Sequence, residues 1–141
     1  MIASVADLVT LHEGRKNLAY QDSRGIWSVG VGHNLQAKPL SDTAVDQIFQ
    51  DDLRDAGNEC IAIFGAAEFA ALSAPRQAAL VDAAFTLGQG GLSKFERMIA
   101  AIQIGQWDTA AAEMLSSTWA TEAPERVKVD AKMLLTGKWP T

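Results

Sequence analysis

The chain has 141 residues and a mass of 15.1 kDa, which fits one compact domain with a hydrophobic core of its own. Its 17 acidic and 12 basic side chains give a net charge of −5, which argues against nucleic-acid binding through a basic face. The sequence has neither a secretory signal nor an apolar run of about 18 residues, so we expect no stable membrane insertion. The single cysteine, Cys60, excludes an internal disulfide and fits a reducing cytoplasm.

The N-terminal residues predict a short helix. Ser4 and Asp7 have the spacing of a capping box, and apolar residues follow at helical spacing. Gly14 is a residue type that commonly ends a helix. Glu13 is therefore expected at the helix end, with its carboxyl group next to whatever the chain forms after it.

The next segment predicts a β-hairpin or a small meander. Residues 18–20 and 26–31 flank the turn-like residues 22–25. Gly30 and Gly32 lie where a full strand would prefer side chains, and such glycines often mark a bulge or a close approach of the backbone.

The remainder of the chain predicts helices. Apolar residues recur every three or four positions between residues 41 and 64, which indicates one helix of about six turns. The acidic residues off that row should form a solvated face, and Cys60 on the row should be core. This acidic set is Asp46, Asp51, Asp55 and Glu59. Residues 76–87 are apolar almost all round and predict a buried central helix.

Three further helices fit residues 95–104, 108–116 and 125–135, which glycine and proline separate. The expected tryptophan positions are the surface for Trp27 and the core for Trp107, Trp119 and Trp139. The predicted fold class is α+β, mostly α, within a single domain of residues 1–141. A hairpin lobe of about residues 14–40 is joined by a connecting helix of about 41–64 to a helical lobe of about 66–141, which includes the N-terminal helix. A cleft between the lobes is the natural ligand site.

Several kinds of site find little support. His12 and Glu13 open like a metalloprotease motif, but no second histidine follows at the required spacing, so we expect no metal. The glycines of "GVGHNL" lack the remaining residues of a phosphate-binding loop. Ser28, His33 and Asp52 could form a triad on paper, yet no nucleophile-elbow signature accompanies them. We expect no cofactor.

Paired carboxylates remain as the candidate chemistry. Hydrolysis of a glycosidic bond needs one carboxylic acid to protonate the leaving oxygen and a second carboxylate to activate water or attack the sugar. Glu13 at a helix end and Asp22 at a hairpin turn could face each other, and Ser28 adds a hydroxyl that could hold a water molecule. Two acids in one surface segment are weak evidence by themselves.

The order of these residues resembles the phage-type lysozymes, glycoside hydrolase family 24. Glu13 is followed by Asp22 nine positions later and by Ser28 after six more, within "HEG", "Y-x-D-x-x-G" and "VGVGHNL". That family has Glu, then Asp or Cys, then Thr at these spacings. Later segments look like its helical lobe in the right order: "AAFTLGQGG", "IGQWDTAAAEM", "TWATEAPER" and "LLTGKW". The resemblance covers essentially the whole chain.

The resemblance implies roles for individual residues. Glu13 looks like the catalytic acid, Asp22 like the partner that positions or activates water, and Ser28 like the hydroxyl beside it. Arg126 matches an arginine that approaches the catalytic glutamate from the helical lobe. The other supporting residues are a structural pair that links hairpin and long helix, His33 and Asp52, and an aromatic on the cleft floor, Phe85.

Three positions depart from the family pattern. Ser28 replaces Thr and loses the methyl group that stiffens the side chain. Val129 stands where a further basic residue is common, and His12 stands before the glutamate in place of an acid. The two latter changes are consistent with the loss of one ion pair between lobes. None of the three removes the catalytic set.

The implied activity is hydrolysis of the β-1,4 bond between N-acetylmuramic acid and N-acetylglucosamine in peptidoglycan, with inversion. Carboxyl groups about 6.5–9.5 Å apart would fit that outcome. The implied protein is a monomeric endolysin that waits in the host cytoplasm, passes a membrane permeabilised by a partner such as a holin, and then lyses the wall. Virion association stays open. Two rivals also stay open: a lytic transglycosylase that uses Glu13 alone, and a non-catalytic peptidoglycan-binding phage module.

Overall fold

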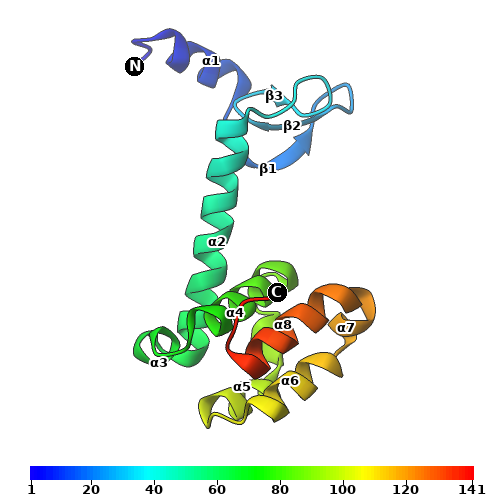
Figure 1. Ribbon diagram of the computed structural model, residues 1–141. Coiled ribbons are helices and arrows are strands. Elements are labelled where there is room, and N and C mark those ends of the chain that lie inside the picture. The colour runs from blue at the N-terminus through cyan, green and yellow to red at the C-terminus, as the bar shows by residue number, and fades with distance from the viewer. The chain divides into compact units, whose positions relative to one another are not determined.

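The chain forms two compact units, Met1–Gln47 and Ile48–Thr141. The computed structural model describes all residues from 1 to 141, and Figure 1 shows its helices and strands. Helix α2, Asp42–Phe64, runs through the boundary between the units as one helix of 23 residues. The prediction of a single long helix here is therefore confirmed. None of the helices is both long and apolar enough to cross a membrane.

The first unit begins with helix α1, Val5–Glu13. The Ser4 hydroxyl accepts a hydrogen bond from the backbone N–H of Asp7 at 3.1 Å, as the capping-box spacing predicts. At the other end, Gly14 takes a φ of +73° and its N–H donates to the carbonyl of Thr10. Glu13 is consequently the last residue of the helix, as expected.

A three-stranded antiparallel sheet follows α1. Its strands are β1, Lys16–Gln21, β2, Trp27–Gly30, and β3, His33–Asn34, in the order β1-β2-β3. The hairpin between β1 and β2 closes where the N–H of Asp22 donates to the carbonyl of Ile26 at 2.9 Å. Ser28 on the central strand pairs with Tyr20 on one side and with Asn34 on the other. The predicted small meander is thereby confirmed.

The second unit is helical. After the C-terminal part of α2 come α3, Ala66–Ala70, α4, Ala74–Leu87, the 3-10 helix η1, Leu92–Lys94, and α5, Glu96–Gln103. Helices α6, Trp107–Leu115, α7, Thr118–Glu122, and α8, Pro124–Thr136, complete the chain. The core gathers apolar side chains from all of these helices. Its fully buried large members are Leu80, Leu92, Met98, Met114, Leu134, Val127 and Cys60.

Helix α4 lies in the middle of this core. Leu80, Ala79 and Ala83 on it have no exposed surface, which confirms the buried central helix. The observed helix lies close to the predicted range 76–87. Ser73 caps its start and Gly88 ends it. Cys60 is also fully buried, as predicted.

The positions predicted for the four tryptophans are confirmed only in part. Trp119 is 4% exposed and lies in the core, whereas Trp107 is half-buried at its edge. The core placement of Trp139 is wrong, because its side chain is 59% exposed. Trp139 follows Gly137, where α8 has already ended, so no helix directs it inward. Trp27 is 46% exposed on β2, in agreement with the surface position expected for it.

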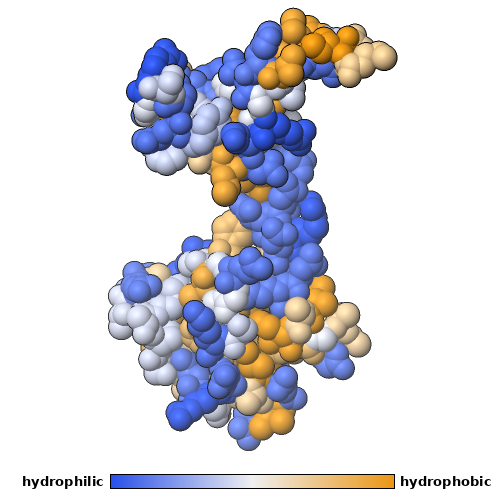
Figure 2. Space-filling model, turned by 180° about the vertical axis from the view of Figure 1, so that it is seen from behind, coloured by the Kyte–Doolittle hydropathy of each residue, from blue (hydrophilic) through white to orange (hydrophobic).

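The acidic face of α2 is mostly solvated. Asp46, Asp51 and Asp55 are exposed, and hydrophilic residues cover much of the visible face of this helix (Figure 2). Glu59 is an exception, because it is half-buried and its Oε1 accepts a hydrogen bond from the N–H of Gly90 at 3.1 Å. Glu59 therefore ties α2 to the loop that follows α4.

Candidate active site

Glu13 and Gly32 face each other within the first unit. Gly32 has a φ of +68°. A Cβ atom built on it would lie 2.8 Å from Oε2 of Glu13, closer than real Cβ contacts allow. The missing side chain therefore makes room for the glutamate, and Glu13 itself is exposed at the end of α1. The close backbone approach expected at these glycines is found at Gly32.

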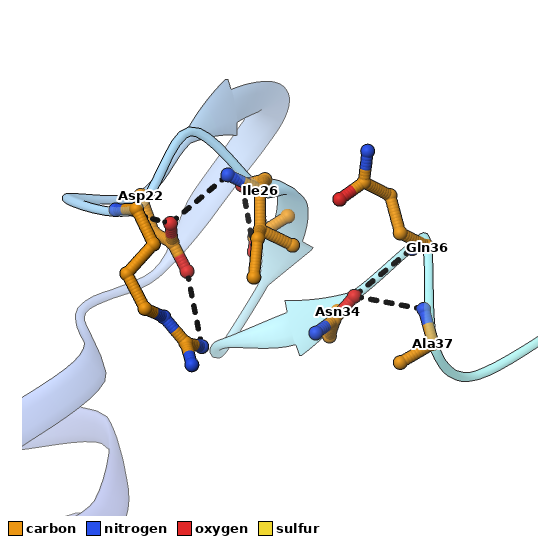
Figure 3. A network of polar contacts seen from close by, with 7 residues as sticks. Asp22, Ile26, Asn34, Gln36 and Ala37 are labelled. Atoms are coloured by element: carbon orange, nitrogen blue, oxygen red, sulfur yellow. Dashed lines mark hydrogen bonds and ion pairs between the residues drawn. The ribbon is translucent and has the colours of Figure 1, made fainter.

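Asp22 is held at the start of the hairpin turn. Its Oδ1 accepts hydrogen bonds from the N–H groups of Arg24 at 2.8 Å and of Ile26 at 3.0 Å (Figure 3). Its Oδ2 lies 3.5 Å from the Arg24 guanidinium. The hydrogen bond from Ile26 is the main cause that lowers the pKa of Asp22 below its usual value, and Arg24 adds to it. Asp22 thus stays ionised in mildly acidic solution.

Ser28 is buried in the middle of the sheet, with 5% of its surface exposed. Its hydroxyl donates a long hydrogen bond of 3.5 Å to the carbonyl of Ile26. Ile26 therefore serves both side chains, since its N–H binds Asp22 and its carbonyl binds Ser28. Sequence reasoning missed this shared backbone anchor, because a backbone group leaves no signal in the residue types.

Histidine and asparagine fix the end of the sheet. His33 Nε2 lies 3.0 Å from the carbonyl of Lys38, to which it donates. The side-chain oxygen of Asn34 accepts from the N–H groups of Gln36 and Ala37, both at 2.9 Å (Figure 3). These contacts set the path of the loop toward α2. The pairing of His33 with Asp52 stays a prediction, because the two residues belong to different units.

Phe85 and Asp52 lie together in the second unit. Both line a cavity of about 780 Å³ between α2 and the C-terminal end of α4. Phe85 meets the edge of Phe49, with ring centroids 6.0 Å apart and an angle of 80° between the rings. Glu59 and Gln89 add polar groups to the same cavity. Whether Phe85 forms the floor of a substrate cleft stays a prediction.

Arg126 has a partner that sequence reasoning missed. Its Nε and Nη2 donate to the two carboxylate oxygens of Asp82 on α4 at 2.7 and 2.6 Å. This bidentate pair raises the pKa of Arg126 and lowers that of Asp82. The approach of Arg126 to Glu13 stays a prediction. The 44 positions between Asp82 and Arg126 explain why no spacing pattern revealed their contact.

The predicted site residues therefore belong to both units of the chain. Glu13, Asp22 and Ser28 lie in the first unit, on α1 and its sheet. Phe85, Asp52 and Arg126 lie in the second. No group of three or more potential metal ligands is present in the chain. A glutamate at a helix end beside a small antiparallel sheet, together with a helical unit, is the arrangement of a lysozyme-like protein.

Comparison with known proteins supplies the family. The model of the family described as Phage lysozyme matches residues 10–130, which is most of the chain and includes all of the candidate site residues. The chain belongs to the phage lysozyme family. Membership supports a muramidase-like peptidoglycan hydrolase, with peptidoglycan as the substrate.

Individual relatives are distant but cover the chain well. It is 26% identical to "Probable T4-type lysozyme 2" of Dictyostelium discoideum, over 89% of this chain and 90% of that protein. It is 23% identical to "Probable T4-type lysozyme 1" of the same organism, over 97% and 96%. A third relative is the "Pre-baseplate central spike protein Gp5" of Enterobacteria phage T4, 25% identical over 95% of this chain but only 28% of that longer protein.

Proposed function

We propose that the chain hydrolyses the β-1,4 bond between N-acetylmuramic acid and N-acetylglucosamine, with Glu13 as the general acid. The observation that carries this proposal is the family match over residues 10–130 combined with the position of Glu13. Glu13 ends α1 and its carboxyl group lies against Gly32, where no side chain obstructs it. An exposed carboxyl group at a helix end can deliver its proton to a leaving oxygen.

Asp22 is the proposed second carboxylate. An acid/base pair works when the two carboxyl groups have different proton affinities, so that one is protonated while the other is ionised. The backbone N–H of Ile26 and the neighbouring Arg24 lower the pKa of Asp22, which favours its ionised form. Its Oδ2 accepts no backbone hydrogen bond and is the oxygen that can orient or deprotonate water.

Ser28 is the proposed water-holding hydroxyl beside Asp22. The hydrogen bond that its hydroxyl donates to the carbonyl of Ile26 is 3.5 Å, which is long for a hydroxyl donor, so a water molecule can replace it. The two side chains are anchored on the same residue, so Ser28 and Asp22 keep a fixed relation. Arg126, Phe85, His33 and Asp52 are proposed as supporting residues of the substrate cleft.

Inversion of the anomeric centre and host-cell lysis complete the proposal. The chain acts as a monomeric endolysin, which needs no cofactor and reaches the wall after a partner of the holin type permeabilises the membrane. The spike protein among the relatives favours a second setting, in which a lysozyme of this kind is carried by the virion. A lytic transglycosylase, or a module that binds peptidoglycan without cleaving it, are the alternatives.

Replacement of Glu13 by Gln tests the assignment, because an amide keeps the shape of the acid but delivers no proton. We expect the folded Glu13→Gln protein to retain less than about one hundredth of the wild-type rate of wall clearing, since general acid catalysis contributes about 10²–10⁴-fold. Glu122→Gln is the matched control, since Glu122 is also an exposed glutamate that ends a helix. The control should keep the full rate.

Mass analysis of the wild-type products separates the alternatives. A hydrolase leaves muramic acid with a free reducing end, whereas a transglycosylase leaves an internal anhydro ring and no added water. A module that only binds would leave the glycan intact. Retention of more than about a tenth of the rate by Glu13→Gln would overturn the role of Glu13.

A further inference from the structure

An aspartate is buried behind the ion pair of Arg126. Asp130 lies on α8, one turn after Arg126, and is 4% exposed. Its Oδ2 is fully buried and receives no hydrogen bond from any protein donor. A buried carboxylate oxygen without a donor is costly, because the charge has lost its water and gained nothing in exchange.

Arg126, the cation that acts on Asp130, is already engaged. Arg126 directs Nε and Nη2 at the two oxygens of Asp82, and the Asp82 side chain in turn lies within hydrogen-bonding reach of Asp130. Two neighbouring carboxyl groups next to one guanidinium carry an excess negative charge unless one of them keeps its proton. Asp130 is the more buried of the two, since 37% of the Asp82 side chain is exposed.

We propose that Asp130 is a protonated positioning residue, whose O–H donates a hydrogen bond to Asp82 and so fixes the carboxylate that orients Arg126. The acid proton accounts for a carboxyl group that is buried beside another carboxylate without a donor of its own, because the neutral acid carries no charge that has to be paired. One proton then links α8 to α4 at their contact. The link to catalysis rests on the proposed function, in which Arg126 supports the substrate cleft, whereas the protonation of Asp130 does not.

The electrostatics of the cluster agree with this arrangement. Burial is the largest cause that raises the pKa of Asp130 to about 8, followed by the hydrogen bond with Asp82 and the charge of Asp82, while Arg126 opposes them. The pKa of Asp82 is lowered, mainly by its bond to Arg126. Helices α6 and α7 also pack against α8, but their charged groups are not among the causes of the shift. These groups are Asp108, Glu113 and Glu122.

The proton on Asp130 should make the folded chain less stable as the pH rises. The pKa of Asp130 is raised from 3.8 to about 8 by folding, so the folded chain binds a proton that the unfolded chain releases. The stability that this proton contributes is complete below about pH 4 and is lost as the pH rises to about 8. Above that pH, two carboxylates face each other and share one guanidinium.

Carbon NMR of the aspartate carboxyl groups in the wild-type chain tests the protonation directly. We expect the Asp130 carboxyl signal to titrate at least two pH units above the usual range of an aspartate. In Asp82→Asn the Asp130 midpoint should move toward acid, because one negative neighbour is gone. A wild-type Asp130 midpoint near 4 would overturn the proposal, whether or not the chain cleaves peptidoglycan.

The equilibrium constant for unfolding of the full chain provides the second test. In the wild type, Asp130 should raise this constant by up to about tenfold per pH unit between pH 5 and 7. Asp130→Asn should lose this contribution, since an amide N–H still donates to Asp82 but does not titrate. The control Asp108→Asn should keep the wild-type slope. Equal slopes for Asp130→Asn and the wild type would contradict the inference. If Asp130→Asn does not fold, the NMR titration of the wild type decides alone.

A positioning role also predicts a change in the pH profile of activity. In the wild type, kcat/KM should decline by several-fold as the pH passes about 8, because Asp82 loses its hydrogen-bond donor. Asp130→Asn should lack this decline, whereas Asp130→Ala should be impaired at every pH. A decline that persists unchanged in Asp130→Asn would refute the positioning role. An active Glu13→Gln protein would instead refute the proposed function and leave the protonation of Asp130 intact.

Discussion

Gly30 and Gly32 share a left-handed backbone conformation, but only Gly32 lies against Glu13. Their φ angles are +69° and +68°, so a side chain strains the backbone equally at both positions. A Cβ atom at Gly30 would meet nothing within 4 Å, whereas one at Gly32 would collide with the Glu13 carboxyl group. The two glycines therefore form a matched pair that separates backbone strain from displacement of the glutamate.

We expect Gly32→Ala to lower the rate of wall clearing far more than Gly30→Ala does. A displacement of about 1 Å at a catalytic group can cost on the order of 10²-fold in rate. Both variants should lose a similar amount of stability, about 1–2 kcal/mol, because the strain of a left-handed residue is the same. Initial rates and thermal melts of both proteins make the comparison. Equal rates would mean that Glu13 does not need its present position.

For single residues, the sequence predicted where a side chain lies in its element better than which distant side chain it contacts. Glu13 at the helix end and Asp22 at the turn could be placed from capping and turn residues alone, since those depend on neighbours within a few positions. The Arg126 contact with Asp82 could not, because it joins two helices far apart in the chain. The burial of Asp130 was equally hidden, since an aspartate in a helix is most often solvated.

Among the elements, α4 and α8 are joined at a second place by Arg76. Its Nε donates to the carbonyl of Leu134 at 2.7 Å and its Nη2 to that of Leu135 at 3.1 Å. These carbonyls lie in the last turn of α8, where a helix leaves acceptors without partners. The guanidinium also lies 3.8 Å from the ring centroid of Trp107. Arg76 thus holds the end of α8 against α4 and α6.

We predict that Arg76→Ala lowers the free energy of unfolding by about 2–4 kcal/mol, because two charged hydrogen bonds and a cation–π contact are lost. Arg76→Lys should recover only part of it, since an ammonium group lacks the planar fork. Arg97→Ala on α5 is the control, as Arg97 is exposed and should change stability little. Denaturant unfolding measures all three. A loss for Arg76→Ala no larger than that for Arg97→Ala would contradict this role.

The helices that were predicted correctly are those long enough to repeat the helical pattern of apolar residues over several turns. The long α2 and the buried α4 were predicted close to their observed ends, because several turns repeat the same pattern and glycine or serine limits it. The short elements α3, α7 and η1 were not predicted, since five residues or fewer do not establish a helical period. Tertiary contacts decide such segments, as they decided the exposed position of Trp139.

For the whole molecule, the net charge of −5 sets the response to salt. A basic protein is attracted to an anionic wall, and ions weaken that attraction, whereas an acidic one is repelled and ions relieve the repulsion. We expect the wall-clearing rate to stay constant or rise between low and physiological ionic strength. Asp46→Lys, on the solvated face of α2, should turn this response toward inhibition by salt, and Asp46→Glu should not.

Initial rates against ionic strength at fixed pH test this response. Arg126→Ala should reduce the rate at every ionic strength, because its contacts with Asp82 at 2.7 and 2.6 Å are far shorter than the screening length of about 8 Å at physiological salt. A steep fall of the wild-type rate between low and physiological salt would show that a local basic surface governs binding in spite of the net charge.

The buried thiol of Cys60 makes the second unit report its own local opening. The thiol is the only one in the chain, has no exposed surface, and has a pKa raised to about 12, mainly by burial. At pH 8 only roughly one thiol in 10⁴ would be a thiolate in the folded state, and none would be within reach of a reagent. An alkylating agent can therefore react only while α2 has come away from the core. The alkylation rate of Cys60 therefore measures how often this unit opens, and no labelling site has to be engineered into the chain.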